Sequence, residues 1–372
     1  MDIVVHRIIS SGLDLEKLSS KSGLDYAKLR SFVNGDVDLT LDEVSKISFA
    51  MEVPMDFLLN DNPEFSAINV LFRKAANSEQ DNFIADKFSY LISNAFTILD
   101  SYNSKLSLFE RFSSISATYI NAEKLSLIFR SQFCGNDNVV PLLDLPQILT
   151  QKLGCLIYTF NISNDIDGAS AIIKDIPFIF ISPRFIPRML FTLAHELGHL
   201  IANHHQNFAI FDRNVFSFTK SKFKDESFAN AFASSLLLPR EAIGLTLKTI
   251  REIHDVQGPI GDVELIYLSR IYGVSFEVAA KRCEDLELLP KGSAFSLYSK
   301  LKKNHGSPEK RADELNIPSR PEITFPFIPP QLISSAVHKV REGELSLGKA
   351  AEILGVSVND VLSYNLTMST NN

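Results

Sequence analysis

The first sixty residues carry their apolar positions at helical spacing, in short runs that each end at a turn signal. Leu15 and Leu18 belong to one such run, and the Gly23 that follows suits the position just after a helix. A short helix, a glycine turn and a second short helix are typical of a helix-turn-helix. The pattern predicts three short helices, over residues 14–22, 25–33 and 40–53.

From about residue 140 the pattern mixes helical spacing with continuous apolar runs, which are typical of buried strands. Helices and strands together predict an α+β domain, in which a small sheet lies beside a helix. The expected elements are a helix over 143–154, strands over 155–162 and 170–182 separated by a turn at 164–169, and helices over 186–204 and 225–239.

The remaining stretches are less distinctive. Residues 61–130 have a helical pattern without recognisable chemistry, and residues 303–330 are rich in proline and charge. The second stretch is expected to be a linker or an arm that wraps the surface. After it, apolar positions around Leu347 and Ile353 predict a small helical pair.

Composition narrows the class of protein only broadly. The chain is 45% hydrophobic and 22% charged, which is ordinary for a globular protein. A formal net charge of -7 argues against a general polyanion binder, although a local basic face remains compatible with it. Three widely spaced cysteines provide no disulfide framework, and no apolar window is long enough to span a membrane. We therefore expect a cytoplasmic protein without a secretory signal.

The sequence HELGH places His195 and His199 one helical turn apart, so that both imidazoles can reach one ion. Glu196 is rotated by about 100° from His195 on such a helix. There it can take a proton from water and later give it to a leaving amine. Zinc with three protein ligands keeps a fourth position open for this chemistry. The alternative is a chance match in a surface helix, but the apolar flanks predict a buried helix, whose ionisable groups need partners.

The third ligand has two main candidates. His205 almost completes the longer pattern HExxHxxGxxH, but Ala202 occupies the glycine place and no methionine turn follows. Glu226 lies on the helix over 225–239, where alanines on the same face would allow a close approach to the HELGH helix. Asp225 competes with it, although its position suits a helix N-cap better. Glu226 is the preferred ligand.

Between about residues 140 and 240 the chain resembles the ImmA/IrrE family of bacterial and phage metallopeptidases. The resemblance rests on the segments "DGAS", "IFISP", "RMLFTLAHELGH" and "ESFANAFASSLLLP". It implies a zincin-like, gluzincin-type domain in which His195, His199 and Glu226 bind Zn²⁺ and Glu196 is the catalytic acid/base. It also implies that the substrate is a partner transcriptional repressor, in stress or mobile-element control.

The N-terminal segment resembles the Xre-type helix-turn-helix that longer members of this family carry. Residues 1–60 hold six Lys/Arg against ten Asp/Glu, a balance that is poor for phosphate contacts. A module that docks a protein partner therefore stays open beside DNA binding. Contact with duplex DNA would use Lys17, Lys21, Tyr26, Lys28 and Arg30.

Together these patterns predict a mostly helical α+β protein with an N-terminal all-α domain. Its expected function is a zinc endopeptidase fused to a helix-turn-helix module. The alternative is a DNA-binding regulator or antitoxin-like protein whose metal site is structural or sensory. Expected partners are a repressor substrate, duplex DNA and a second copy of the chain. The predicted segments are a helix-turn-helix domain at 1–62, a helical connecting region at 63–134, the metallopeptidase domain at 135–290, and a linker with a C-terminal helical element at 291–372.

Overall fold

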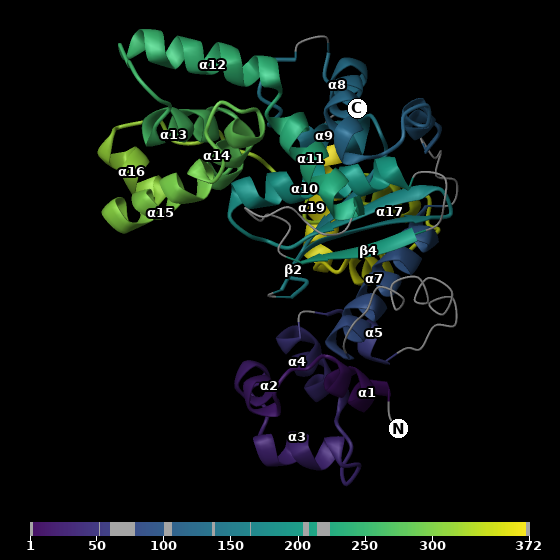
Figure 1. The fold of residues 1–372 in the computed structure, drawn as a ribbon. Coiled ribbons are helices and arrows are strands. Elements are labelled where there is room, and N and C mark those ends of the chain that lie inside the picture. Colours follow the sequence, from purple (N-terminus) through teal and green to yellow (C-terminus); the bar gives the residue numbers. More distant parts are fainter. Residues whose placement is uncertain are drawn as a thin grey trace. The chain divides into compact units, whose positions relative to one another are not determined.

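A computed structural model provides the fold of the chain (Figure 1). It divides into two compact units, one formed by Met1–Tyr102 with Ile328–Asn372 and the other by Asn103–Phe327. Within the described ranges, no helix combines the length and apolar character needed to cross a membrane. The structure describes residues 3–51, 53–59, 79–99, 106–135, 138–163, 165–203, 208–213 and 224–369.

The N-terminal part of the first unit consists of short helices with well-formed ends. The Asp14 side chain accepts a hydrogen bond from the Glu16 backbone N–H, and Gly23 ends the same helix with φ of 71°. Thr40 and Glu43 form a reciprocal capping box at a later helix. The three helices predicted here are confirmed. The described helices are α1 (Ile3–Ser10), α2 (Leu15–Ser22), α3 (Tyr26–Val33), α4 (Leu41–Ala50), α5 (Met55–Leu59) and α7 (Glu79–Ile98).

Three C-terminal helices complete this unit, where we predicted a pair. They are α17 (Pro330–Arg341), α18 (Leu347–Leu354) and α19 (Val358–Ser369). The Asn94 side chain of α7 donates a hydrogen bond to the Ile353 carbonyl of α18, 3.4 Å away. The last helices therefore pack on α7, a contact that joins residues far apart in the sequence and has no local sequence pattern.

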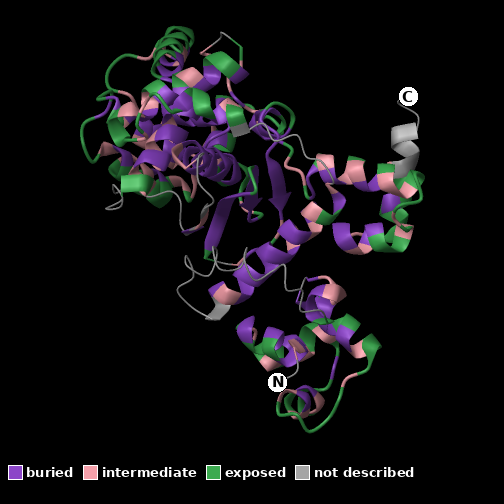
Figure 2. Ribbon diagram, turned by 90° about the vertical axis from the view of Figure 1, so that its right-hand side faces the viewer, coloured by how far each residue is buried: buried purple, intermediate pink, exposed green. Residues whose placement is uncertain are grey.

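In its described residues, the second unit is built around a mixed sheet of four strands in the order β1-β3-β2-β4. β1 pairs with β3 in parallel, while β2 pairs antiparallel with both β3 and β4. The first three strands are buried along their whole length (Figure 2). The strands are β1 (Leu156–Thr159), β2 (Ile166–Ile173), β3 (Ile176–Ile181) and β4 (Phe208–Arg213).

The sheet corrects two details of the sequence prediction. The apolar run at 170–182 is a hairpin rather than one strand, because Lys174 and Asp175 turn the chain with φ of 49° and 64°. The segment expected as a turn at 164–169 mostly belongs to β2, which begins at Ile166. β4 was not predicted. A mostly helical chain with one small mixed sheet nevertheless confirms the α+β class.

Helices of this unit pack against the sheet, and α10 and α11 are the ones that position the candidate site. α10 packs against β2 and β3, and α11 runs along α10 (Figure 1). One hydrophobic cluster joins these elements into the core of the unit. The helices are α8 (Ala122–Phe133), α9 (Leu145–Gln151), α10 (Ile186–Ala202), α11 (Lys224–Leu237), α12 (Arg240–Ile253), α13 (Asp262–Ile271), α14 (Phe276–Asp285), α15 (Ser293–His305) and α16 (Pro308–Glu314), with 3-10 turns η1 (Leu106–Phe112) and η2 (Tyr119–Asn121).

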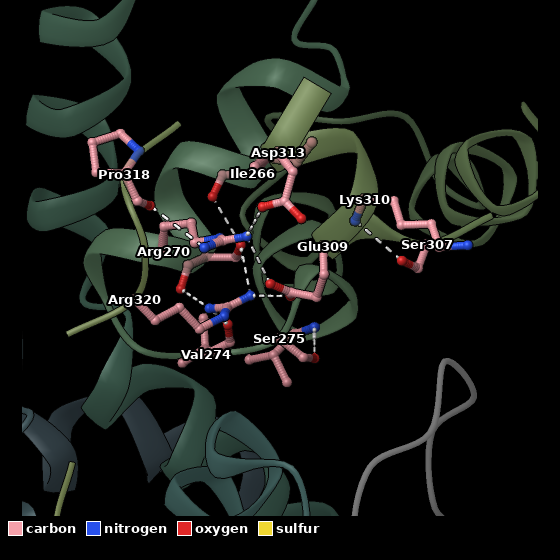
Figure 3. A network of polar contacts seen from close by, with 12 residues as sticks. Ile266, Arg270, Val274, Ser275, Ser307, Glu309, Lys310, Asp313, Pro318 and Arg320 are labelled. Carbon is pink, nitrogen blue, oxygen red and sulfur yellow. Dashed lines mark hydrogen bonds and ion pairs between the residues drawn. The ribbon is translucent and has the colours of Figure 1, made fainter. Parts of the chain in front are cut away.

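A polar network fastens the chain after α16 to α13 (Figure 3). The Glu309 carboxylate accepts from Arg270 of α13 and from Arg320, with both N–O distances at 2.8 Å. Arg320 also donates to the backbone carbonyls of Ser269 and Val274 at 2.5 Å. Each guanidinium therefore has a carboxylate partner, which offsets the cost of removing it from water.

The segment up to Phe327 is an arm on the surface of the second unit. Ile317 and Ile323 are buried in its hydrophobic core. The Phe327 carbonyl accepts a hydrogen bond from the Thr159 backbone N–H, 3.3 Å away at the end of β1. Of the two alternatives left open for residues 303–330, these contacts favour the wrapping arm over the linker.

Candidate metal centre

The HELGH motif lies in the most buried stretch of α10. His195, Glu196 and His199 each have 0% exposed surface. Pro187 lies in the first turn of the helix, where its fixed φ favours the start and its missing N–H is not needed. Apolar residues on the remaining faces of α10 pack into the core around the motif. The sequence therefore places three ionisable side chains in a dry interior, where each one needs a polar partner or an ion.

Four side chains converge there, and their donor atoms all lie within 4.8 Å of one another: His195, His199, Asp212 and Glu226. The two Nε2 atoms are 3.1 Å apart. Asp212 Oδ2 lies 3.4 Å and 3.3 Å from them, and the Glu226 oxygens lie 3.4 Å from each. A tetrahedral ion with bonds of about 2.1 Å separates its ligand atoms by about 3.4 Å. The imidazole and carboxylate donors therefore fit a zinc ion in type and in spacing.

Asn230 orients the first histidine. Its amide oxygen lies 3.2 Å from His195 Nδ1 and can only accept, so this ring nitrogen carries the proton. In the neutral ring, Nε2 of His195 is thereby left with a lone pair that faces the other donors. A hydrogen bond of this kind commonly fixes the orientation of a metal-binding histidine. His199 Nδ1 is buried without a hydrogen-bond partner, so its tautomer is not fixed in the same way.

Glu226 reaches the cluster from α11 because this helix lies very close to α10. A Cβ atom on Gly198 would be 3.1 Å from the Ala229 Cα atom. Only a glycine facing an alanine allows this separation, which agrees with the small residues noticed in the sequence. Asp225 is exposed in the first turn of α11 and takes no part in the cluster. His205, the other candidate ligand, lies outside the described residues.

Asp212 was not predicted as part of the site. It lies on β4, directly opposite Gly168 of β2, beside a register shift between Ile166 and Gly168. Such an irregularity can turn a side chain away from the regular alternation of a strand. The run "FAIFD" of apolar and aromatic residues is a weak strand signal that could have indicated β4. Its pairing with β2, which brings the carboxylate to the histidines, has no local signature.

The Glu196 side chain extends from α10 toward β2. The close approach of its carboxyl group to this strand depends on a glycine, Gly168. A Cβ atom on Gly168 would lie 2.5 Å from Glu196 Oε1 and 2.6 Å from Thr192 Cγ2. Both Glu196 carboxylate oxygens are buried without hydrogen-bond partners. Packing against Gly168 and Thr192 thus limits where the carboxyl group can lie.

The pKa shifts of these groups follow from their burial and from the charges of their neighbours in the cluster. Burial, followed by the charge of Asp212, raises the pKa of Glu196 well above 4.5. Burial favours neutral His199, but the facing Asp212 outweighs it and raises the pKa well above 6.5. Burial likewise opposes the charge on Asp212, yet the two imidazoles lower its pKa well below 3.8. A bound cation would compete with these protons, because it attracts the carboxylates and repels an imidazolium.

The residues considered for DNA contact lie on α2 and α3 of the other unit. The Lys28 ammonium pairs with Glu43 at 2.5 Å, and this hydrogen bond lowers the pKa of Glu43 to about 2. Lys28 and Arg30 are two positions apart, so they point about 200° apart around α3. DNA contact by these residues stays a prediction. The exposed residues of the set are Lys17, Lys21, Tyr26 and Arg30.

The fold and the cluster define a class of protein: a helical α+β domain with a candidate metal centre on an HExxH helix. Comparison with known families agrees with this class, because residues 150–284 match the family model of the IrrE N-terminal-like domain, a peptidase family. The match supports a relationship with the ImmA/IrrE family for this part of the chain. No curated protein shows significant similarity to the chain.

Proposed function

We propose that the chain is a zinc-dependent endopeptidase whose reaction centre is formed by α10, α11 and β2. The observation that carries the proposal is the convergence of His195, His199 and Glu226 around one point, with Glu196 directly beside it. The match of residues 150–284 to a peptidase family supports the same reaction class. Two imidazoles and a carboxylate favour zinc over the hard cations that oxygen-only sites prefer.

Each side chain has a distinct task in this proposal. His195 and His199 hold the ion through Nε2, and Glu226 adds a negative ligand from the second helix. A bound zinc ion would act as a Lewis acid that lowers the pKa of a water molecule to about 7 and polarises a peptide carbonyl. Glu196 accepts the proton of the attacking water and delivers it to the leaving amine nitrogen. Asn230 keeps His195 in the tautomer that this arrangement requires.

The decisive variant is Glu196→Gln, which removes the proton acceptor while keeping the size of the side chain. We expect cleavage of a peptide library, followed by mass spectrometry, to fall by about 10²- to 10⁴-fold. Zinc content per chain should stay unchanged, because Glu196 is not a ligand. Glu241→Gln, an exposed residue of α12, is the matched control and should retain full activity. Undiminished cleavage by Glu196→Gln would remove the proposed base, and a wild type that binds no zinc would remove the proposed function.

We also propose that the N-terminal helices form a helix-turn-helix module that brings the peptidase to its substrate. The Gly23 turn between α2 and α3 supports this arrangement. The Lys28–Glu43 ion pair and the acidic local balance favour docking of a protein, such as a transcriptional repressor, over contact with duplex DNA. A gel-shift assay with duplex DNA at low salt tests this preference, since strong binding would contradict it.

A further inference from the structure

The candidate centre contains more donors than a zinc peptidase needs. Catalytic zinc sites have three protein ligands and keep a fourth position for water or substrate. Here His195, His199 and Glu226 supply three donors, and Asp212 supplies a fourth at the same distance. Four protein ligands around zinc are characteristic of closed, structural sites. The extra carboxylate therefore conflicts with an open reaction centre and requires an explanation.

Asp212 also occupies the place that a reacting water would need. Its Oδ2 atom lies 3.4 Å and 3.3 Å from the two Nε2 atoms, and Gly168, which pairs with Asp212 across the sheet, lies directly against Glu196 Oε1. A water activated by Glu196 has to lie between this base and the ligands. Asp212 supplies the fourth donor there, and its buried Oδ2 has no well-formed hydrogen bond beyond its contacts with the two imidazoles. A cation is the partner that would satisfy this atom.

Burial gives an independent indication that the centre is closed. His195, Glu196 and His199 have no exposed surface, and Asp212 has 3%. The side chain of Glu226 is 29% exposed, so among these groups it alone has appreciable exposure. A peptide bond cannot reach Glu196 in this arrangement. Access requires a movement of one of the elements that cover it.

β4 is the element best suited to move. Among the described strands it lies at the edge of the sheet and pairs with β2. The register shift next to Gly168 interrupts this pairing close to Asp212. An edge strand with an irregular ladder gives up fewer hydrogen bonds on displacement than the central strands do.

We propose that Asp212 is a fourth protein ligand that closes the metal centre at rest, and that β4 must withdraw it before a substrate can bind. The inference rests on the proposed zinc-peptidase function and adds a form of autoinhibition to it. Withdrawal of Asp212 opens the fourth position and uncovers Glu196 in one movement. A partner or substrate that pairs with β4 in place of β2 would have this effect.

The first test uses the wild-type full-length chain with Co²⁺ in place of zinc. A closed tetrahedral centre is expected to give an intense visible spectrum that acetohydroxamate, a small metal-binding probe, does not change at millimolar concentration. Ready binding of acetohydroxamate would show an open position and overturn the inference while leaving the peptidase proposal intact. A wild type that binds neither zinc nor Co²⁺ would overturn both.

The second test compares Asp212→Ala with Asp225→Ala, an exposed aspartate next to Glu226. Loss of the ligand should lower zinc affinity, measured by competition with a chromogenic chelator, by about 10- to 100-fold or more. The Co²⁺ form of Asp212→Ala should bind acetohydroxamate, and added acetate should restore the wild-type spectrum. Asp225→Ala should behave as wild type in each measurement. Unchanged zinc affinity and spectrum in Asp212→Ala would contradict the assignment.

Discussion

His195 and His199 can bind a cation only through ring nitrogens that carry no proton. The hydrogen bonds of each ring therefore decide which nitrogen can bind an ion. For His195 the deciding contact is with Asn230, whose oxygen accepts the Nδ1 proton. Glu196 has no well-formed hydrogen bond, and packing against Gly168 and Thr192 limits where its carboxyl group can lie. The base is therefore more sensitive to steric changes than to loss of a hydrogen bond.

Gly168→Ala tests this steric dependence. The new methyl group would meet Glu196 Oε1 at 2.5 Å and Thr192 Cγ2 at 2.6 Å, so the carboxyl group has to move. A displacement of about 1 Å costs roughly 10²-fold in turnover, and overpacking costs about 1–3 kcal/mol of stability. We expect peptide cleavage to fall by about that factor while the zinc content stays at wild-type level.

Gly244→Ala is the matched control, because nothing lies within 4 Å of the added methyl group. On the exposed face of α12 it should keep activity and raise the unfolding temperature slightly, since alanine favours helices over glycine. Equal activity of Gly168→Ala and Gly244→Ala would mean that the position of Glu196 does not depend on β2.

At the scale of elements, the separation between α10 and α11 sets the geometry of the centre. The histidines lie on one helix and Glu226 on the other, so their distances change whenever the helices move apart. The contact of Gly198 with Ala229 determines how closely the helices can pack. At this contact α10 contributes a glycine, which has no side chain, and α11 contributes only the methyl group of an alanine.

Gly198→Ala should separate the two helices by a few tenths of an ångström, because its methyl group would lie 3.1 Å from the Ala229 Cα atom. We expect weaker zinc binding in a chelator competition assay, by up to about tenfold, since a shifted ligand loses part of its contribution. The overall stability should change little, because higher helix propensity offsets part of the strain.

Gly348→Ala provides the comparison, since this glycine of α18 has open space around it. It should leave zinc affinity unchanged. Equal affinity of Gly198→Ala and wild type would show that Glu226 follows the movement of α11 without losing its contact.

At the scale of the whole molecule, the cluster affects the stability of the second unit through its charges. A divalent ion that binds the folded chain and not the unfolded chain stabilises it by about 2.7 kcal/mol at one hundred times the dissociation constant. With the ion removed, the two imidazoles, Asp212 and Glu196 remain buried together, and Glu226 lies partly exposed beside them. The protonation state of these groups then decides how much the cluster lowers the free energy of unfolding of the second unit.

The chelated and zinc-loaded forms should respond to pH in opposite directions. The raised pKa values of His195, His199 and Glu196 contribute stability below their ordinary values of 6.5, 6.5 and 4.5, and this contribution is lost as pH rises through the folded values. The unfolding temperature of the chelated protein should therefore fall between about pH 6 and 9. With excess zinc it should rise over the same interval, because fewer protons compete for the ligands.

Differential scanning fluorimetry across this pH range, with EDTA or with excess zinc, measures both trends. Parallel curves would show that zinc does not bind to the histidines of the cluster. The Glu196→Gln variant should show a smaller fall in the chelated form, because its amide has no proton to lose in this range.

Much of the candidate site followed from local sequence pattern. The HELGH helix, the role proposed for Glu196 and the choice of Glu226 depend on spacing within α10 and α11, which helical geometry translates directly into position. The N-terminal helices were predictable for the same reason, since caps such as Asp14 and turns such as Gly23 act within a few residues.

The remaining parts of the site and of the fold depend on contacts between residues that are distant in the chain. β4 is short, and its pairing with β2 brings Asp212 to the histidines from another element. The packing of α17, α18 and α7 in one unit is equally nonlocal. The sequence pattern alone indicated His195, His199 and Glu226 as residues that could hold an ion. The fourth donor, the Asp212 carboxylate, is apparent only in the folded chain, because a strand's partner depends on the complete fold rather than on its own residues.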